Sequence, residues 1–165
     1  MDEKNILNLI KKFSNKLPKF EDGRIDYSNS DEAPVITVFV KYQDKILLLK
    51  RSDKVRTYRG KWNTIAGYLD EVRPIKEKVL EEIKEEIQVF EKDILNIKYK
   101  DSYKLEDKKI KKIWIVHPVL VELKNKAEIV LDWEHIEYRW IKPVEINNFD
   151  IVTGLDKILK KVLNE

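Results

Sequence analysis

Apolar residues recur at helical spacing in three segments of the chain. Residues 3–15 place apolar side chains on one side and lysines on the other, as expected of an amphipathic helix. Residues 74–87 begin at Pro74, which suits a first helical turn because its missing N–H would have no helical partner there. The third segment starts at Thr153, a residue able to cap a helix, and repeats apolar residues at i, i+3, i+4 and i+7. Three amphipathic helices are therefore predicted.

Strands are predicted by short runs of apolar and β-branched residues between these helices. Runs 34–40 and 45–51 flank a polar turn, so they are expected to pair antiparallel. The polar segment 101–112 is typical of a hairpin tip. Further strands are predicted at 63–66, 94–99, 113–123 and in the segment that ends at Trp140.

This order of elements predicts an α/β fold, an α/β/α sandwich in which helices cover both faces of a mixed sheet. The helix at 74–87 is expected on one face and the C-terminal helix on the other. The chain has 165 residues, enough for one such core. We divide it into an N-terminal helix and connector at 1–33 and a main domain at 34–165.

Composition narrows the class of protein. Charged residues make up 38% of the chain and hydrophobic residues 42%, with a net charge of only +3, which argues against nucleic acid as a partner. The chain has no cysteine, so disulfides, thiolate metal sites and a cysteine nucleophile are excluded. No apolar run approaches the roughly 20 residues of a membrane span, and the charged N-terminus has no secretory pattern. We therefore expect a cytoplasmic protein that does not enter a membrane.

The helix at 74–87 carries an unusual group of carboxylates. Glu82, Glu85 and Glu86 flank its apolar stripe. Glu82 and Glu86 are a like-charge i,i+4 pair, and Glu85 and Glu86 lie near the helix C-terminus, where the helix dipole disfavours anions. One interpretation is a charged outer face, which is common in proteins rich in Lys and Glu. The other is a site for divalent cations, because Mg²⁺ takes carboxylate oxygens and bridges to phosphates.

The stretch at 67–89 resembles the signature of the Nudix hydrolases. That signature is Gly, five residues, Glu, seven residues, then Arg-Glu-apolar-any-Glu-Glu-any-Gly-apolar. Gly67, the run Glu-Ile-Lys-Glu-Glu at 82–86 and Val89 match it. Three positions depart from it, with Arg73 in place of Glu, Glu81 in place of Arg and Gln88 in place of Gly.

The resemblance implies the Nudix fold and a hydrolase acting on a phosphoanhydride bond. The implied substrate is a nucleoside diphosphate linked to another group, with Mg²⁺ as cofactor and Mn²⁺ as an alternative. Carried over by position, Glu82, Glu85 and Glu86 would hold the metal together with the backbone carbonyl of Ala66. A carboxylate would take the proton of the attacking water. Members of the family differ over which glutamate is the base, so Glu82 is the first candidate and Glu134 the second.

Glu134 lies six positions before Trp140, in a segment that resembles the late part of many Nudix proteins. There an acidic loop residue precedes an aromatic strand and completes the metal site or acts as base. The alternative is that Glu134 and His135 are ordinary loop residues.

The loop between the strand at 45–51 and Gly67 interleaves cations with aromatic residues. Cations beside a metal site suit a polyphosphate, and aromatic rings stack on bases. Arg51 and Arg59 are the candidates for phosphate contact. The alternative is an ordinary basic surface loop.

Arg73 and Glu81 exchange the residue types that the Nudix pattern has at these positions. Two separate losses would leave unrelated residue types more often than a reversed pair. We therefore expect the two side chains to form an ion pair of opposite polarity, which would pin the loop that carries Gly67 and orient Glu82.

One other function stays open from the sequence. The three departures are compatible with a non-hydrolytic nucleotide- or RNA-binding module whose signature has decayed. The isomerases of the same fold that act on prenyl diphosphates use a cysteine, which this chain lacks. A small-molecule nucleotide is the expected partner, and a homodimer is compatible with the sequence.

Overall fold

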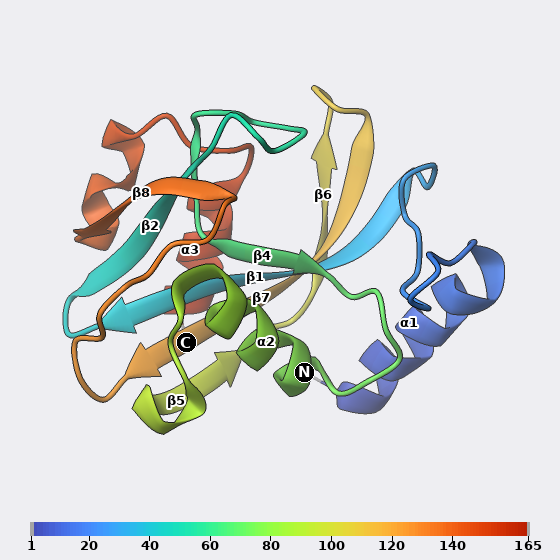
Figure 1. Ribbon diagram of the computed structural model, residues 1–165, viewed down its shortest axis with the longest axis horizontal. Coiled ribbons are helices and arrows are strands. Elements are labelled where there is room, and N and C mark those ends of the chain that lie inside the picture. The colour runs from blue at the N-terminus through green and yellow to red at the C-terminus, as the bar shows by residue number, and fades with distance from the viewer. Residues whose placement is uncertain (1, 165) are drawn as a thin grey trace.

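The structure is a computed structural model that describes residues 2–164, with helices on both faces of one sheet (Figure 1). The helices are α1 (Glu3–Lys16), α2 (Ile75–Ile87) and α3 (Leu155–Leu163), and 3₁₀ turns follow at Glu91–Asp93 and Pro143–Asn148. The strands are β1 (Glu32–Tyr42), β2 (Lys45–Arg51), β3 (Trp62–Asn63), β4 (Ile65–Tyr68), β5 (Ile94–Tyr99), β6 (Tyr103–Asp107), β7 (Lys112–Leu123) and β8 (His135–Ile141).

The eight strands form a mixed sheet around β1 and β7, which pair in parallel from Glu32–Ile113 to Lys41–Glu122. Every other pair in the sheet is antiparallel, including β1 with β2 and with β4, and β7 with β5 and with β6. The sheet is therefore mixed and the fold is α/β, as predicted.

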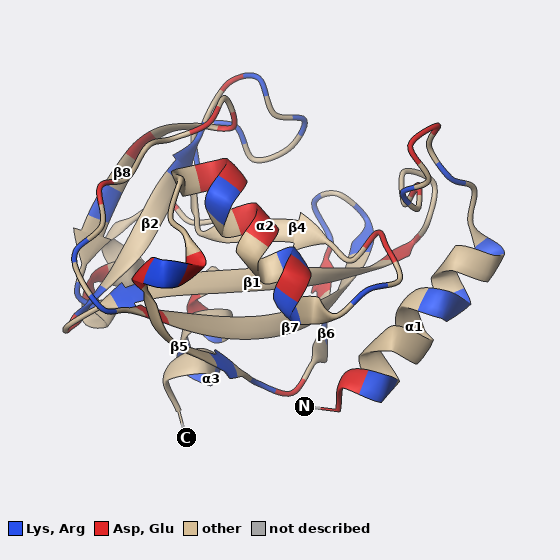
Figure 2. Ribbon diagram, turned by 60° about the horizontal axis from the view of Figure 1, so that its bottom comes forward, with Lys and Arg blue, Asp and Glu red and all other residues tan. Residues whose placement is uncertain are grey.

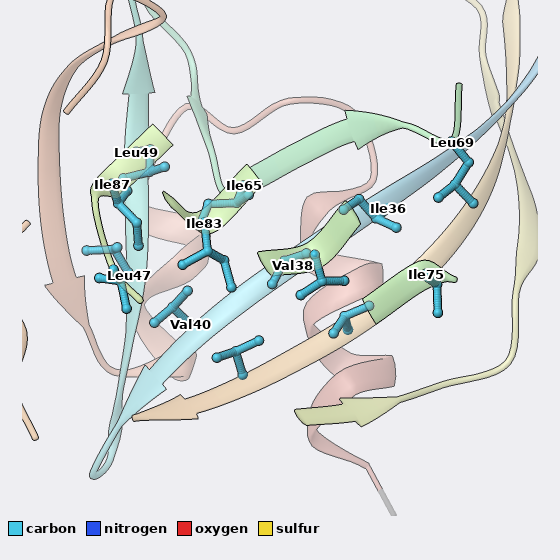
Figure 3. Packing of buried hydrophobic residues seen from close by; sticks show 14 of the residues in the cluster. Ile36, Val38, Val40, Leu47, Leu49, Ile65, Leu69, Ile75, Ile83 and Ile87 are labelled. Carbon is cyan, nitrogen blue, oxygen red and sulfur yellow. The ribbon is translucent and has the colours of Figure 1, made fainter. Parts of the chain in front are cut away.

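Alternation along β1 and β2 creates two cores, because successive side chains of a strand point to opposite faces. Ile36, Val38 and Val40 of β1 join the core under α2, whereas Phe39 joins the core under α3. On the α2 face, Ile83 and Ile87 and their neighbours pack on these strands (Figure 3). The predicted placement of the two helices on opposite faces is confirmed.

Helix α1 is the amphipathic helix predicted near the N-terminus. Ile6, Ile10 and Phe13 are buried and belong to the same core as α2. Asp2 caps the helix by accepting a hydrogen bond from the Lys4 amide at 3.0 Å. Among residues 2–164, no helix combines the length and the apolar character that crossing a bilayer requires.

Two local predictions were wrong. The polar segment 101–112 is not only a hairpin tip, because β6 lies within it and pairs with β7. Thr153 does not cap α3, which begins after Gly154 without a side-chain cap. The Thr153 hydroxyl instead lies 2.7 Å from the Tyr58 hydroxyl, so a long-range contact replaces the local cap.

Candidate active site

The loop between β4 and α2 brings Gly67 against the side chain of Glu82. A Cβ atom at position 67 would lie 2.8 Å from the Glu82 carboxyl carbon, closer than real side chains approach. A side chain at position 67 would therefore displace the Glu82 carboxylate, so glycine serves close approach here rather than an unusual backbone angle. The contact fixes the carboxylate of α2 beside strand β4.

The three carboxylates of α2 differ sharply in exposure. Glu86 is buried at 3% exposure, and its Oε2 has no hydrogen-bond partner. The Glu82 side chain is 13% exposed, whereas Glu85 is exposed. Acidic and basic residues both occur along the ribbon of α2 (Figure 2). The interpretation of these glutamates as a plain outer face is wrong for Glu86, which faces inward.

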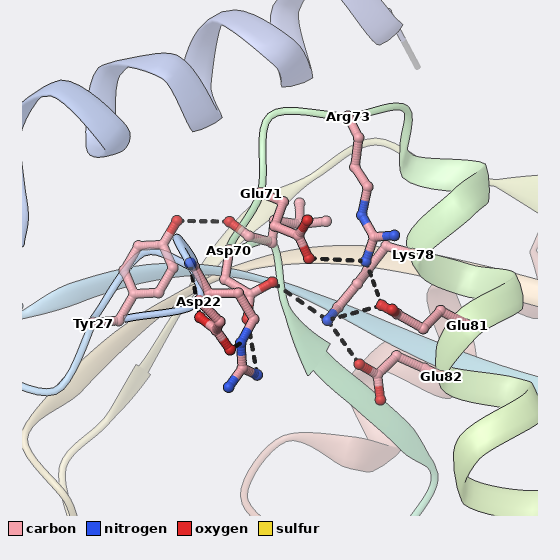
Figure 4. Close-up of polar contacts among 10 residues, drawn as sticks. Asp22, Tyr27, Asp70, Glu71, Arg73, Lys78, Glu81 and Glu82 are labelled. Carbon is pink, nitrogen blue, oxygen red and sulfur yellow. Dashed lines mark hydrogen bonds and ion pairs between the residues drawn. The ribbon is translucent and has the colours of Figure 1, made fainter. Parts of the chain in front are cut away.

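Lys78 is a central residue of the site that the sequence reasoning overlooked. Its side chain is 8% exposed, and its ammonium lies 2.8 Å from Glu82 Oε1, 3.4 Å from Asp70 and 3.5 Å from Glu81 (Figure 4). Burial alone would lower the pKa of Lys78, but the carboxylates, Glu82 first, raise it. The site thus contains a permanent internal cation.

Arg73 and Glu81 are in contact, as the reversed residue types predicted. Nη2 of Arg73 contacts Oε2 of Glu81 and lies 3.4 Å from Glu71 (Figure 4). The Arg73 side chain is 23% exposed and that of Glu81 36%. Since Glu81 also lies 3.5 Å from Lys78, the pair ties the loop before α2 to the cluster around Glu82.

Charge reversal tests whether this pair stabilises the loop. Arg73→Glu or Glu81→Arg should each lower the free energy of unfolding by on the order of 1 kcal/mol, since the pair is partly exposed. The double variant should recover only part of the loss, because the new Glu would meet Glu71 and the new Arg would meet Lys78. Urea unfolding of the four proteins gives the coupling free energy, and a value near zero would remove any stabilising role of the pair.

Gln88, the third departure from the signature, occupies a left-handed conformation at φ 54° and ψ 41°. It ends α2, and its amide donates to the Lys84 carbonyl at 3.1 Å. A glycine would adopt this conformation without steric cost, whereas a side chain makes it less favourable. The backbone geometry of the signature is therefore kept although the residue differs.

Glu134 is held at the site by the segment that precedes β8. The Asp132 amide donates to the Glu86 carbonyl at 3.2 Å, and the Ser52 amide donates to the Glu134 carbonyl at 2.8 Å. These bonds tie the loop to the C-terminal end of α2 and to the end of β2. One carboxylate oxygen each of Glu86 and Glu134 and one ring nitrogen of His135 lie within 4.8 Å of one another.

The buried acids are electrostatically unfavourable without a cation. Burial, then the charges of Glu82, Glu134 and Asp132, hold the pKa of Glu86 well above its usual range. Burial raises the pKa of Glu82 despite Lys78, and burial followed by Asp132 raises the pKa of Glu134. Burial lowers the pKa of His135, so this ring is neutral around pH 7.

This donor set fits a divalent cation. A buried carboxylate oxygen without a partner, Glu86 Oε2, lies among further acids whose charge a cation would neutralise. Among the described residues, Glu86, Glu134 and His135 have donor atoms close enough together to hold an ion, and Glu85 lines the adjacent cavity. Glu82 differs from them, because one of its oxygens is bonded to Lys78.

A cavity of about 390 Å³ extends from the carboxylates toward α3. Its lining includes Arg51 together with Ala66, Glu82, Glu85 and Glu134, all residues singled out in the sequence. Arg51 also donates from Nε to the Thr57 carbonyl at 3.0 Å. Arg59, the other arginine predicted to contact phosphate, is not among the described residues that line the cavity. It is exposed and donates to the Val55 carbonyl at 2.8 Å.

The lining of the cavity includes a polar network that the sequence did not reveal. The Tyr58 hydroxyl donates to Asp107 at 2.5 Å and lies 2.7 Å from the Thr153 hydroxyl. All three residues line the cavity and come from distant parts of the chain. No local pattern marks them, because the hairpin containing β6 brings Asp107 to this place.

Comparison with known proteins agrees with this geometry. The family model of the NUDIX domain matches residues 31–162. The nucleoside triphosphatase NudI of Escherichia coli is 22% identical over 137 residues, which cover 76% of this chain and 93% of that protein. The MutT protein of Methanosarcina mazei has a similar fold, with a TM-score of 0.63, 22% identity and coverage of 80% of this chain and 93% of the other. The Ap4A hydrolase of C. elegans has a TM-score of 0.62 with 17% identity, and the match covers 78% of this chain and 93% of the other.

The family match includes the whole sheet, α2, α3 and every residue of the carboxylate cluster. The two solved structures share the fold at low identity. Since the match extends over most of the chain, the protein belongs to the Nudix hydrolase family, whose members act on phosphoanhydride bonds.

Proposed function

We propose that this protein is a divalent-metal-dependent pyrophosphohydrolase of nucleoside triphosphates or related nucleoside diphosphate derivatives. The observation that carries the proposal is one cavity lined by Glu82 and Glu85 of α2 together with Glu134 and Arg51. Its volume of about 390 Å³ lies within the range of small-molecule sites. The relative NudI, described as a nucleoside triphosphatase, supports this substrate class.

Glu85, Glu86 and Glu134 would hold Mg²⁺ or Mn²⁺, with the carbonyl of Ala66 beside them. A bound divalent ion supplies charge neutralisation of the phosphates and lowers the pKa of a coordinated water. Arg51 lines the same cavity and would contact the phosphates that the ion leaves unneutralised.

Glu82 is proposed as the general base that takes the proton of the attacking water. Its Oε1 is bonded to Lys78 at 2.8 Å, which leaves Oε2 for the water. Burial raises the pKa of Glu82 above its usual value, which brings the base closer to neutral pH. Since only the ionised form accepts a proton, kcat/KM should fall as the pH falls through this raised pKa.

The proposal is tested by incubating the purified protein with each nucleoside triphosphate, ADP-ribose, dinucleoside polyphosphates and nucleotide sugars. Each assay is run with Mg²⁺, with Mn²⁺ and with EDTA, and the phosphate products are separated by ion chromatography. We expect turnover of one substrate class only with a divalent ion. Turnover that is equal in EDTA would overturn the metal dependence.

Replacing Glu134 by Gln separates metal holding from base catalysis. We expect kcat to fall on the order of 100-fold and the Mg²⁺ concentration for half-maximal activity to rise, because a ligand is lost. Glu82→Gln is the matched variant and should lower kcat by about 10²–10⁴-fold at an unchanged metal requirement. If Glu134→Gln leaves kcat and the metal requirement unchanged, Glu134 has no part in the site.

A further inference from the structure

Glu86, Glu134 and His135 form a group whose chemistry differs from that of an all-carboxylate Mg²⁺ site. One donor atom from each lies within 4.8 Å of the others. An ion with ligands at roughly 2.0–2.2 Å holds donor atoms about 3–4 Å apart, so small side-chain movements would close the group. Glu134 lines the cavity and the other two residues are buried behind it.

The contacts of His135 orient the ring as a metal-binding histidine is oriented. Nδ1 lies 3.1 Å from Asp132 Oδ1, and this carboxylate makes Nδ1 the protonated nitrogen. The lone pair of Nε2 is then directed toward Glu86, whose Oε1 lies 3.7 Å away. That distance is too long for a hydrogen bond, so no direct bond between the two residues occupies the space.

Glu86 supplies a second and independent observation. It is 3% exposed, and its Oε2 is a buried oxygen without a hydrogen-bond partner. An unsatisfied buried carboxylate oxygen costs free energy that a coordinated cation would remove.

We propose that Glu86, Glu134 and the Nε2 atom of His135 bind one divalent transition-metal ion, with Asp132 orienting the histidine. Imidazole nitrogen favours transition-metal ions such as Co²⁺ or Zn²⁺ over Mg²⁺, which takes oxygen ligands. This inference deepens the proposed function by naming the class of ion that the site prefers. It rests on the proposed function only for the role of the ion in catalysis. The alternative is a histidine that only ties the loop at 130–134 to α2.

The chain offers a matched control, because it has two histidines and the other is His117. His117 is also buried, and its Nδ1 lies 3.1 Å from the Ile115 carbonyl. Its described contacts include none of the carboxylates of the cluster. His117→Asn should therefore leave metal binding as it is in the unmodified protein.

The test uses the 165-residue chain without a histidine affinity tag. All metal is first removed from the protein, and Mn²⁺ is then added in the absence of nucleotide. Pulsed electron paramagnetic resonance should show coupling of Mn²⁺ to a ¹⁴N nucleus, and this coupling should change to ¹⁵N when the histidines are labelled. His135→Asn should abolish the coupling, whereas His117→Asn should keep it. Co²⁺ affinity measured by titration calorimetry should fall about 10–100-fold in His135→Asn, with little change for Mg²⁺.

Bound Mn²⁺ without nitrogen coupling would overturn the proposal, as would coupling that survives in His135→Asn. If His135→Asn does not fold, the ¹⁵N-histidine exchange in the unmodified protein decides the question, and Asp132→Asn should weaken Co²⁺ binding. Because no nucleotide is present, a protein that binds Mn²⁺ through nitrogen but hydrolyses no substrate would refute the proposed function alone. Hydrolysis without nitrogen coupling would refute only this inference.

Discussion

Glu86→Gln should lower kcat by about 10³-fold or more. Glu86 is the most buried of the three glutamates, and it is the one with an unpartnered oxygen. Losing the ionised ligand should cost several kcal/mol of transition-state stabilisation, and each 1.36 kcal/mol corresponds to about tenfold in rate. Steady-state kinetics at saturating Mg²⁺ and Mn²⁺ measures the loss.

The same change should stabilise the metal-free protein above neutral pH. Burial raises the pKa of Glu86, so between pH 4.5 and this raised pKa the folded protein keeps a proton that the unfolded chain has lost. The free energy of unfolding therefore falls as the pH rises through that window. Glu86→Gln removes this dependence and should be more stable than the unmodified protein at pH 8, by on the order of 1–3 kcal/mol.

Glu77→Gln is the matched control on the same helix, because Glu77 is exposed in the first turn. It should change neither kcat nor the pH dependence of stability beyond a few tenths of a kcal/mol. A Glu86→Gln variant with kcat within about tenfold of the unmodified protein would remove Glu86 from the metal-holding residues.

Lys78→Met should destabilise the metal-free protein by about 3–5 kcal/mol, because it leaves the largely buried Glu82 without its cation and leaves Asp70 with only Arg24, at 3.8 Å. Methionine preserves the length of the side chain but not its charge. The freed carboxylates become available to a divalent ion. Adding Mg²⁺ should therefore raise the melting temperature of Lys78→Met more than that of the unmodified protein.

Lys76→Met provides the control for this experiment. Lys76 lies on the same helix, but its side chain is 55% exposed and pairs with Glu91 at the surface. Its loss should cost less than about 1 kcal/mol and should not alter the response to Mg²⁺. If Lys78→Met is as stable as Lys76→Met, Lys78 does not neutralise the cluster.

The layers of the fold were predictable because they depend on local patterns. The apolar stripe of α2 and the run of β1 carry the information about which face is buried. Strand β6 was missed because only one of its five residues, Asp107, is fully buried, and that residue is polar. Its place in the sheet comes from pairing with β7 rather than from its own composition.

The contacts of the candidate site were predictable only in part. The resemblance to the signature singled out Glu82, Glu86 and Glu134, and the exchanged residue types predicted the contact between Arg73 and Glu81. Lys78 gave one signal, since Glu82 stands at i+4 from it in the sequence. The approach of His135 to Glu86 had no sequence signal, because it depends on hydrogen bonds between the loop at 130–134 and the end of α2.

The most direct test of the whole account is the product analysis of nucleoside triphosphate hydrolysis by the unmodified protein and by Glu86→Gln. We expect that, with a divalent ion present, the unmodified protein cleaves a phosphoanhydride bond, and that EDTA or the Glu86→Gln change each reduces this cleavage about 10³-fold or more. Cleavage by the unmodified protein that persists in EDTA, or that Glu86→Gln leaves undiminished, would contradict it.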